Sequence, residues 1–355
     1  MRRVVSERAV GRGEGRVKGP ERVLLAHGGG GRLTRKLVEE LFLPALENPL
    51  LATLTDAAVL PEIPSGRPAL TTDAFVVDPP VFAGGDLGYL SVCGTVNDLA
   101  MVGARPRWLT WALIIEEGTD GELLETCVHG AARAAKEADI DIVAGDTKVV
   151  PRGKGDRLFA VTAGLGVVPP GRELSDRQIQ PGDVLLVSGP IGDHGAAVLA
   201  HRHALEAPGL RSDCAPLAGL VEALLESGAA VRAMHDPTRG GVVTVCHEVA
   251  ERCGLRVFLD QAAIPVRPEV GAVCDLLGLD PLALACEGRV LVWVAAEDAG
   301  RAADAMQAHP LGGGTSVIGR VEPAAVGSPP VVLKTVVGGE RPLDLLSGLD
   351  LPRIC

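Results

Sequence analysis

The chain has 355 residues, of which 47% are hydrophobic, 22% are charged and 3% are aromatic. These proportions are typical of a folded globular protein and exclude a disordered scaffold. The formal net charge of −11 argues against nonspecific binding to nucleic acid or anionic membranes, and the scarcity of aromatic rings argues against a stacking platform for single strands.

The first 22 residues are a basic extension, which we expect to be disordered. This segment lacks the apolar stretch of ~7–15 residues that a secretory signal requires, and the chain has no apolar run of ~18 residues that would cross a membrane. The eight cysteines form no CxxC pattern, so all but the terminal one are expected to be small core residues. These features predict a cytoplasmic protein with no membrane or nucleic-acid partner.

The remaining chain divides into two units of α/β character. In the first, residues 23–168, three segments have helical spacing of apolar residues and four are typical of strands. The predicted helices are 34–46, 87–102 and 121–138, and the predicted strands are 69–77, 108–115, 140–144 and 158–168. The run of Pro169, Pro170 and Gly171 marks the expected boundary.

The second unit, residues 169–337, continues this alternation. Its predicted helices are 195–205, 217–227, 240–253 and 297–308, and its predicted strands are 183–188, 256–259, 290–295, 316–321 and 331–336. Gly338 and Gly339 open a tail, 338–355, which we expect to be extended and mobile because Pro352 disfavours helix at the residue before it. The predicted fold class is therefore α/β and α+β, in two domains with a flexible C-terminal tail.

Five aspartates recur beside small residues at expected junctions of strand and loop: Asp56, Asp73, Asp98, Asp146 and Asp236. Carboxylates at strand ends are hard oxygen ligands, which suit Mg²⁺ that in turn holds phosphate groups. Any one of them alone is explained as well by a turn or a helix cap. Five such residues in one chain favour a site for magnesium and phosphate.

Other segments fit a phosphate ligand, although the chain has neither a P-loop nor a GxGxxG motif. The segment DPTRGG lies where a helix is expected to begin, so its free backbone N–H groups and its guanidinium would attract an anion. Its candidate binding residues are Thr238, Arg239, Gly240 and Gly241. Lys148 is a second candidate cation, and HGGGG at 27–31 is either a hinge or a loop over a nucleotide. For both cations, simple solvation at the surface is the alternative.

The last residue of the chain, Cys355, would carry an accessible thiol beside the terminal carboxylate. A thiol on an arm hinged by glycines can carry an acyl-like group into the protein's own active site. A terminal cysteine also arises by chance, so this residue alone does not decide the function.

Together, these motifs resemble those of the HypE family of hydrogenase maturation proteins, which are carbamoyl dehydratases of the PurM-like (aminoimidazole-ribotide-synthetase) superfamily. The resemblance covers residues 23–355 and rests on LAHGGGG, DAAVL, TTDAFVV, GGDLG, CGTVNDLAMVGA, IIEEG, AGDTKVV, GDHG, SDCAPL, DPTRGG and PRIC. Several motifs are shared across the superfamily, whereas the closing PRIC is much more specific to HypE proteins. The resemblance implies a two-domain PurM-like fold, a homodimer formed through the N-terminal domains, and ATP bound near the domain cleft.

The resemblance also implies a reaction. A carbamoyltransferase partner, HypF, would load a carbamoyl group onto Cys355 as a thiocarboxamide. ATP with Mg²⁺ would then phosphorylate the amide oxygen, and loss of phosphate would leave a thiocyanate on the same sulfur. The cyano group would pass to iron on a HypC–HypD scaffold complex and become a cyanide ligand of a [NiFe]-hydrogenase.

Motif by motif, the resemblance makes the five aspartates candidate ligands of Mg²⁺ and ATP. Asn97, Thr147 and Lys148 would line the same pocket, with Lys148 also catalytic, and Glu287 in ACEGRV would be the general base. The segment departs from the family pattern, since Cys286 and Arg289 replace an Asn and a Lys, and His235 stands where Arg is more usual. A solvated turn residue is the alternative for Glu287.

Rival members of the superfamily are selenophosphate synthetase, aminoimidazole ribotide synthetase and thiamine-monophosphate kinase. The first would need a reactive cysteine or selenocysteine near the start of the folded region, yet no cysteine precedes Cys93. The reactions of aminoimidazole ribotide synthetase and thiamine-monophosphate kinase do not require a terminal PRIC. A noncatalytic docking protein is a further alternative, and it predicts no ATP turnover.

Overall fold

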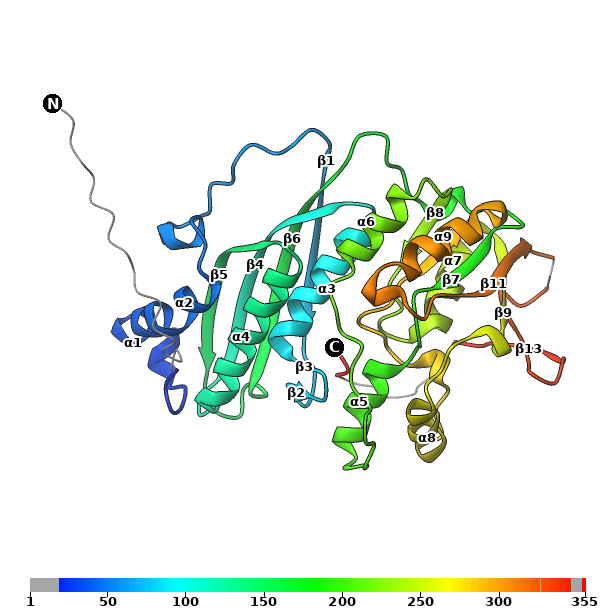
Figure 1. Ribbon diagram of the computed structural model, residues 1–355. Coiled ribbons are helices and arrows are strands. Elements are labelled where there is room, and N and C mark those ends of the chain that lie inside the picture. Colours follow the sequence, from blue (N-terminus) through cyan, green and yellow to red (C-terminus); the bar gives the residue numbers. More distant parts are fainter. Residues whose placement is uncertain (1–18, 326, 346–352) are drawn as a thin grey trace.

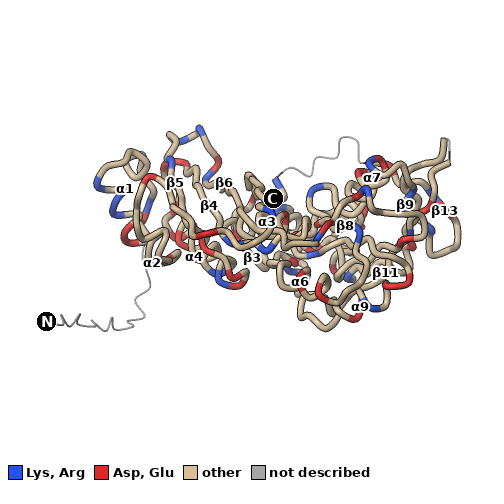
Figure 2. Tube along the Cα trace, turned by 90° about the horizontal axis from the view of Figure 1, so that it is seen from above, with Lys and Arg blue, Asp and Glu red and all other residues tan. Residues whose placement is uncertain are grey.

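Two domains lie side by side in the computed structural model, which describes residues 19–325, 327–345 and 353–355. Each domain combines one sheet with helices (Figure 1). The C-terminal residue lies between the two domains, as the perpendicular views in Figures 1 and 2 agree. Among the helices of these described residues, none is long and apolar enough to cross a membrane.

The first domain has a four-stranded sheet in the order β1-β6-β4-β5, in which only β4 and β5 run parallel. Its strands are β1 (Arg67–Phe75), β4 (Arg105–Glu116), β5 (Asp141–Val150) and β6 (Leu158–Val168), with a separate hairpin of β2 (Val81–Phe82) and β3 (Gly85–Asp86). Its helices are α1 (Arg32–Leu37), α2 (Leu43–Leu46), α3 (Leu87–Met101) and α4 (Gly121–Glu137), and the π turn η2 (Val38–Phe42) joins α1 to α2. The elements predicted here are confirmed, although β5 runs well past its predicted end.

Helix α3 lies at the centre of this domain. Asp86 caps its N-terminus by accepting a hydrogen bond from the Tyr89 amide, and every residue of α3 except Asp98 is buried. Gly88 allows α4 to approach, since a Cβ there would lie 1.7 Å from the carbonyl oxygen of Cys127. The one residue of α3 that is not fully buried therefore carries a carboxyl group.

The face of this sheet that points away from α3 is apolar and open. Residues on β1 alternate between exposed and half-buried, and Leu70 is 76% exposed. The outward residues of the neighbouring strand β6 are half-buried: Phe159, Val161, Ala163 and Leu165. An apolar sheet face left open in this way is typical of a surface that another layer covers.

The second domain has a seven-stranded sheet in the order β13-β12-β9-β11-β7-β10-β8, antiparallel except between β12 and β9. Its strands are β7 (Val184–Val187), β8 (Val231–His235), β9 (Leu255–Asp260), β10 (Leu291–Val294), β11 (Ser316–Pro323), β12 (Val331–Lys334) and β13 (Glu340–Pro342). Its helices are α5 (Asp193–Arg202), α6 (Ala218–Glu226), α7 (Gly241–Cys253), α8 (Pro268–Leu277) and α9 (Ala299–Gln307). Strands β8 and β13 and helix α8 are additions to the predicted elements.

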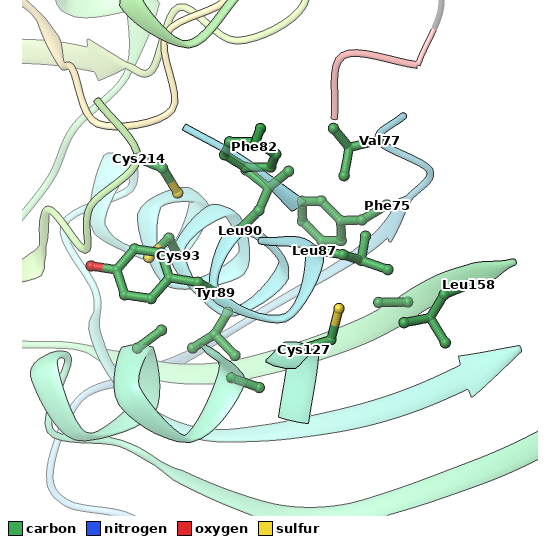
Figure 3. Packing of buried hydrophobic residues seen from close by; sticks show 14 of the residues in the cluster. Phe75, Val77, Phe82, Leu87, Tyr89, Leu90, Cys93, Cys127, Leu158 and Cys214 are labelled. Carbon is green, nitrogen blue, oxygen red and sulfur yellow. The ribbon is translucent and has the colours of Figure 1, made fainter. Parts of the chain in front are cut away.

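One apolar cluster joins the two domains. It includes Phe75 and Cys93 from the first domain, and Cys214 and Leu284 from the second. Figure 3 shows part of this cluster, with the phenylalanines around the start of α3 and Cys214 above Cys93. Ile354, from the end of the chain, belongs to the same cluster and is 5% exposed. The interface between the domains is therefore part of the hydrophobic core.

Two predicted flexible segments are partly ordered. The amide of Thr335 donates to the carbonyl of Gly339, and this turn directs β13 back along β12, so 340–342 belong to the sheet rather than to a tail. Near the N-terminus, the carbonyl of Glu21 accepts a hydrogen bond from Gly121, which fixes the end of the basic extension. Residues 1–18, which are most of the predicted extension, and residues 346–352 of the predicted tail lie outside the described residues.

Candidate active site

A cavity of about 140 Å³ lies between the two domains. The first domain contributes β1 and α3, and the second contributes the loops after β8 and before β10. The lining residues are Asp73, Ala74, Phe75, Gly94, Asp98, Asp236, Thr238, Arg239, Glu287 and Cys355. All of them except Ala74, Phe75 and Gly94 are residues that the sequence predicts for the site.

Three of the predicted aspartates line this cavity together. Asp98 accepts a hydrogen bond of 2.7 Å from the Thr71 hydroxyl on β1. Burial and the charge of Asp98 raise the pKa of Asp73 to about 6, and burial also raises the pKa of Asp98. Burial and the charge of Asp98 raise the pKa of Asp236 to about 7. Three crowded carboxyl groups form a site that a cation would stabilise.

The turn between β8 and α7 has the geometry of an anion site. Gly240 and Gly241 have φ angles of +76° and +62°, which favour glycine. A Cβ on Gly241 would also lie 2.5 Å from the carbonyl oxygen of Leu282. Arg239 lines the cavity, and its charge opposes the rise in the pKa of Asp73. Helix α7 therefore begins beside the cavity, where the positive end of its dipole and the guanidinium of Arg239 favour an anion. Gly240 and Gly241 themselves do not line the cavity, and the Gly241 amide donates to the carbonyl of Thr238 over 2.9 Å.

Glu287 is buried at the base of the cavity, with 2% of its surface exposed. Its backbone amide donates to Asp213 over 3.1 Å, while its Oε1 has no hydrogen-bond partner among the described residues. Burial, together with the charges of Asp236 and Asp213, raises the pKa of Glu287 well above its usual range. The alternative of a solvated turn residue is therefore excluded.

Asn97 does not line the cavity as predicted. Its side chain is fully buried, and its Nδ2 donates to the carbonyl oxygens of Ala215 and Glu287 over 3.1 and 3.2 Å. Its Oδ1 accepts a hydrogen bond of 2.8 Å from the amide of Leu217. Since both ends of the amide are engaged by backbone, Asn97 joins α3 to two loops of the second domain.

A buried ionic group that the sequence analysis missed lies behind Glu287. Arg289 Nε is 3.5 Å from Asp213 Oδ2, and Arg289 Nη2 is 3.6 Å from Asp193 Oδ2. The same guanidinium donates to the carbonyl of Pro190 over 2.8 Å. Asp193 lies in the motif GDHG and Asp213 in the motif SDCAPL. These two motifs could have identified this group from the sequence.

Cys355 lies inside the cavity, and its thiol interacts with the carboxyl group of Glu287. Burial and the charge of Glu287 raise the pKa of this thiol. The backbone of the chain end runs beside 76–78, where Asp78 N donates to Arg353 O over 3.0 Å and Val76 N to Cys355 O over 3.3 Å. Arg353 also donates to the Val76 carbonyl over 3.0 Å and forms an ion pair with Asp156.

The remaining predicted residues lie elsewhere. Asp146 and Lys148 are exposed on β5 and form an ion pair, with Lys148 Nζ 2.8 Å from Asp146 Oδ2. Both residues are in register with the outward residues of β4. Strands β6 and β4 separate β1 from β5, so this pair is about 14 Å from β1, three strand spacings away. Thr147 lines a separate apolar cavity of about 210 Å³, and Asp56 is exposed in a bend.

The expected position of the aspartates at the junctions of strands and loops is wrong for most of them. Asp73 lies within β1, Asp98 within α3 and Asp146 within β5, and only Asp236 directly follows a strand. Asp73 and Asp98 meet in the cavity because α3 packs across β1, and not because a strand ends there.

Comparisons with known proteins assign the chain to a family. Residues 54–168 match the family profile "AIR synthase related protein, N-terminal domain", and residues 180–330 match "AIR synthase related protein, C-terminal domain". The curated carbamoyl dehydratase HypE of Rhodobacter capsulatus is 47% identical over 94% of this chain and 98% of its own length.

Two solved structures extend this likeness. A hydrogenase maturation protein HypE in complex with ATP has a TM-score of 0.90 and 42% identity, covering 94% of this chain and 99% of that one. The structure of a HypE–HypF complex matches with a TM-score of 0.76 and 43% identity, covering 87% of this chain and 99% of that one. With its cavity between two PurM-like domains and its terminal cysteine in that cavity, the chain belongs to the HypE family of carbamoyl dehydratases, which act in hydrogenase maturation.

Proposed function

We propose that this protein uses ATP to convert a thiocarboxamide on Cys355 into a thiocyanate. The observation that carries this proposal is the position of the terminal thiol, which lies beside Glu287 in a cavity with three carboxyl groups and Arg239. A noncatalytic docking peptide would have no reason to bury its thiol against a carboxyl group whose pKa is raised.

The reaction removes one oxygen and two protons from the carbamoyl group. ATP would supply the phosphoryl group that makes the amide oxygen a good leaving group, and ADP would depart. One N–H proton leaves to a base when the oxygen is phosphorylated, and the second leaves as the C–O bond breaks and phosphate departs. The C≡N bond forms from the electron pairs of the two N–H bonds, so no oxidant is needed.

Glu287 is the residue that we propose as the base. Its Oε1 has no partner among the described residues, so it is available to a proton on the substrate nitrogen. Its raised pKa makes its carboxylate a stronger base than a solvated glutamate. The enclosed position of Cys355 would also limit hydrolysis of the activated group.

Asp73, Asp98 and Asp236 fit a role in holding Mg²⁺ and phosphate. Their oxygens are the ligands that Mg²⁺ prefers, and a divalent cation would relieve the crowding that raises their pKa values. Within the described chain, no three Asp, Glu, His or Cys side chains are already arranged to hold a metal ion. Phosphate oxygens would therefore complete the coordination, as is usual for Mg²⁺, and Thr238, Arg239, Gly240 and Gly241 would bind the phosphates.

We further propose a homodimer formed through the open sheet face of the first domain. Leu70 and the outward residues of β6 would be covered by the same face of a second copy. Asp146 and Lys148 lie on that face, three strand spacings from the β1 residues that line the cavity of their own chain. A catalytic role of Lys148 would therefore be at the cavity of the partner copy. A Leu70→Lys substitution should convert the dimer to monomers in sedimentation experiments, and an unchanged dimer would contradict this interface.

The proposed partners are HypF and a HypC–HypD complex. The similarity of this chain to the HypE solved in a HypE–HypF complex supports HypF as a partner. The need to deliver a cyano group to iron supports the HypC–HypD complex. All eight cysteines are free thiols in the structure, which favours the reducing cytoplasm as the compartment.

Mass spectrometry of the C-terminal peptide tests the reaction. When HypF and its substrates are present but this chain does not hydrolyse ATP, the peptide should gain about 43 Da. When this chain turns over Mg-ATP, the gain should fall to about 25 Da, because one water is lost. Both adducts should be absent from a Cys355→Ala variant. An unmodified peptide with a competent HypF would overturn the proposal.

A further inference from the structure

His194 is a fully buried histidine that contacts the end of the chain. It lies in α5 of the second domain, and its Nε2 is 2.8 Å from the carbonyl oxygen of Ile354. Its Nδ1 is 2.8 Å from the hydroxyl of Ser212. The ring packs edge-on against Phe82 of the β2–β3 hairpin at a centroid distance of 5.2 Å. His194 therefore joins elements of both domains to the residue before Cys355.

The hydrogen bonds around this ring define its tautomer. A carbonyl oxygen only accepts, so Nε2 must carry the proton that it donates to Ile354. The Ser212 hydroxyl oxygen already accepts a hydrogen bond of 3.0 Å from the amide of Cys214 and is free to donate its own proton to Nδ1. Burial lowers the pKa of His194, which favours this neutral ring.

We propose that His194 is the positioning residue for the reaction, because its Nε2–H holds the Ile354 carbonyl and thereby keeps the Cys355 thiol beside Glu287. This inference rests on the proposed function and adds a specific residue to it. Most of the other contacts of the chain end involve Arg353, whose carbonyl also accepts a hydrogen bond of 2.9 Å from Arg202, and they fix the chain two residues before the thiol. The Val76 amide donates to the Cys355 carbonyl over a longer 3.3 Å, whereas His194 holds the peptide group that joins Ile354 to Cys355 over 2.8 Å.

This role separates two steps that use the same thiol. Carbamoyl loading by a partner enzyme requires the thiol outside the cavity, and dehydration requires it inside. A side chain that stabilises only the docked state should therefore affect dehydration and not slow loading. A merely structural residue would affect both steps through loss of folded protein.

The first experiment measures docking without ATP or partner. The full chain is treated with iodoacetamide, and alkylation of Cys355 is followed by mass spectrometry of its peptide. The side chain of asparagine reaches only the position of Nδ1, so His194→Asn loses the donor to Ile354. Cys355 should then be alkylated about tenfold faster, which is the change expected when a hydrogen bond worth ~1.4 kcal/mol is lost. Glutamine reaches the position of Nε2, so His194→Gln should stay near the wild-type rate. His201→Asn, at an exposed histidine of the same helix, is the matched control and should not change it.

The second experiment follows one turnover of carbamoyl-loaded protein with Mg-ATP. His194→Asn should slow conversion about tenfold while its rate of loading is not reduced, and His194→Gln should restore conversion. If the wild-type chain itself shows no conversion, the proposed function fails, but the alkylation rates still decide whether His194 docks the thiol.

Unchanged alkylation and conversion in a His194→Asn protein that melts like the wild type would overturn the inference. If that variant does not fold, His194→Phe decides the question, since it keeps a ring against Phe82 but has no Nε2–H to donate to Ile354. Faster alkylation of Cys355 in His194→Phe supports the role of His194, and an unchanged rate contradicts it.

Discussion

Asn97 Nδ2 donates a hydrogen bond of 3.2 Å to the backbone carbonyl of Glu287, so a helix of the first domain holds the candidate base of the second. The same amide also engages Ala215 and Leu217. Relative motion of the two domains would break all of these bonds together. Asn97 therefore fixes the relative position of the two domains around the cavity, although its own side chain does not line the cavity.

Replacement of Asn97 by alanine should reduce both stability and activity. Loss of the amide leaves the Ala215 carbonyl and the Leu217 amide buried without a partner, and leaves the Glu287 carbonyl with only the 3.4 Å bond from the Ala215 amide. These losses should lower the free energy of unfolding by about 2–4 kcal/mol. Urea denaturation measures this change. Asn97→Asp keeps the acceptor for Leu217 but places a buried carboxyl oxygen against the carbonyl oxygens of Ala215 and Glu287, so it should be at least as destabilised as the alanine variant. Wild-type stability in the alanine variant would contradict the linking role.

Replacement of Glu287 by glutamine should stop the dehydration step while loading continues. Removal of a general base typically costs 10²–10⁴-fold in rate, so the carbamoyl adduct of about 43 Da should accumulate with Mg-ATP present. Glu297→Gln, at an exposed glutamate of the same domain, is the control. Rapid conversion in Glu287→Gln would assign the base to another residue.

The pH dependence of dehydration should reflect the raised pKa of Glu287. A base works only when deprotonated, so the rate should rise with pH, with a midpoint above the ~4.3 of a solvated glutamate. Single-turnover rates measured over a pH series give this midpoint. A midpoint at ~4.3 would show that an ordinary, solvated carboxylate is responsible.

The crowded aspartates should make the protein without Mg-ATP less stable as pH rises. Asp236 has a pKa of about 7 in the folded state, so the folded chain holds its proton more tightly than the unfolded chain does. Stability from this group is present below the unfolded value near 3.9 and is lost as pH rises toward 7. Asp236→Asn should therefore raise the melting temperature by a few degrees at pH 8 and have little effect at pH 4. Equal effects at both values would mean that charge is not the cause.

Lys148 should act in trans if the open sheet face forms the dimer. Lys148→Ala and Cys355→Ala homodimers should each be inactive. A mixture allowed to exchange subunits should regain up to about a quarter of the conversion, because one site of each heterodimer pairs a normal thiol with the partner's normal lysine. Without recovery in exchanged heterodimers, Lys148 would have to act within its own chain.

Much of the fold was predictable because its elements have clear periodicity. The predicted 121–138 corresponds to α4, whose apolar residues lie on one face, and the predicted 158–168 matches β6. Strand β13 was missed because ERP is short and exposed at the sheet edge. Helix α8 was missed because Pro268 and Gly271 interrupt its pattern, although a proline in the first turn is favourable.

The site was only partly predictable from sequence. Asp73, Asp98 and Asp236 were identified by residue type, but their meeting depends on how α3 packs across β1, which no local pattern encodes. Asn97 was assigned to the pocket by the family resemblance, yet a helix turns successive side chains by about 100°, so Asn97 points away from the direction of Asp98. His194 and Arg289 were missed because their roles come from contacts between residues far apart in the chain.

The docked position of Cys355 has a consequence for how the reaction would respond to concentration. The thiol that carries the substrate belongs to the same polypeptide as the cavity, so the reacting groups meet at an effective concentration set by the chain. Each intact dimer would then process its own thiols at a rate that does not depend on how many other dimers are present. A cell that makes few copies would lose no efficiency in this step while the dimer persists, and encounters with the partners before and after it would depend on abundance.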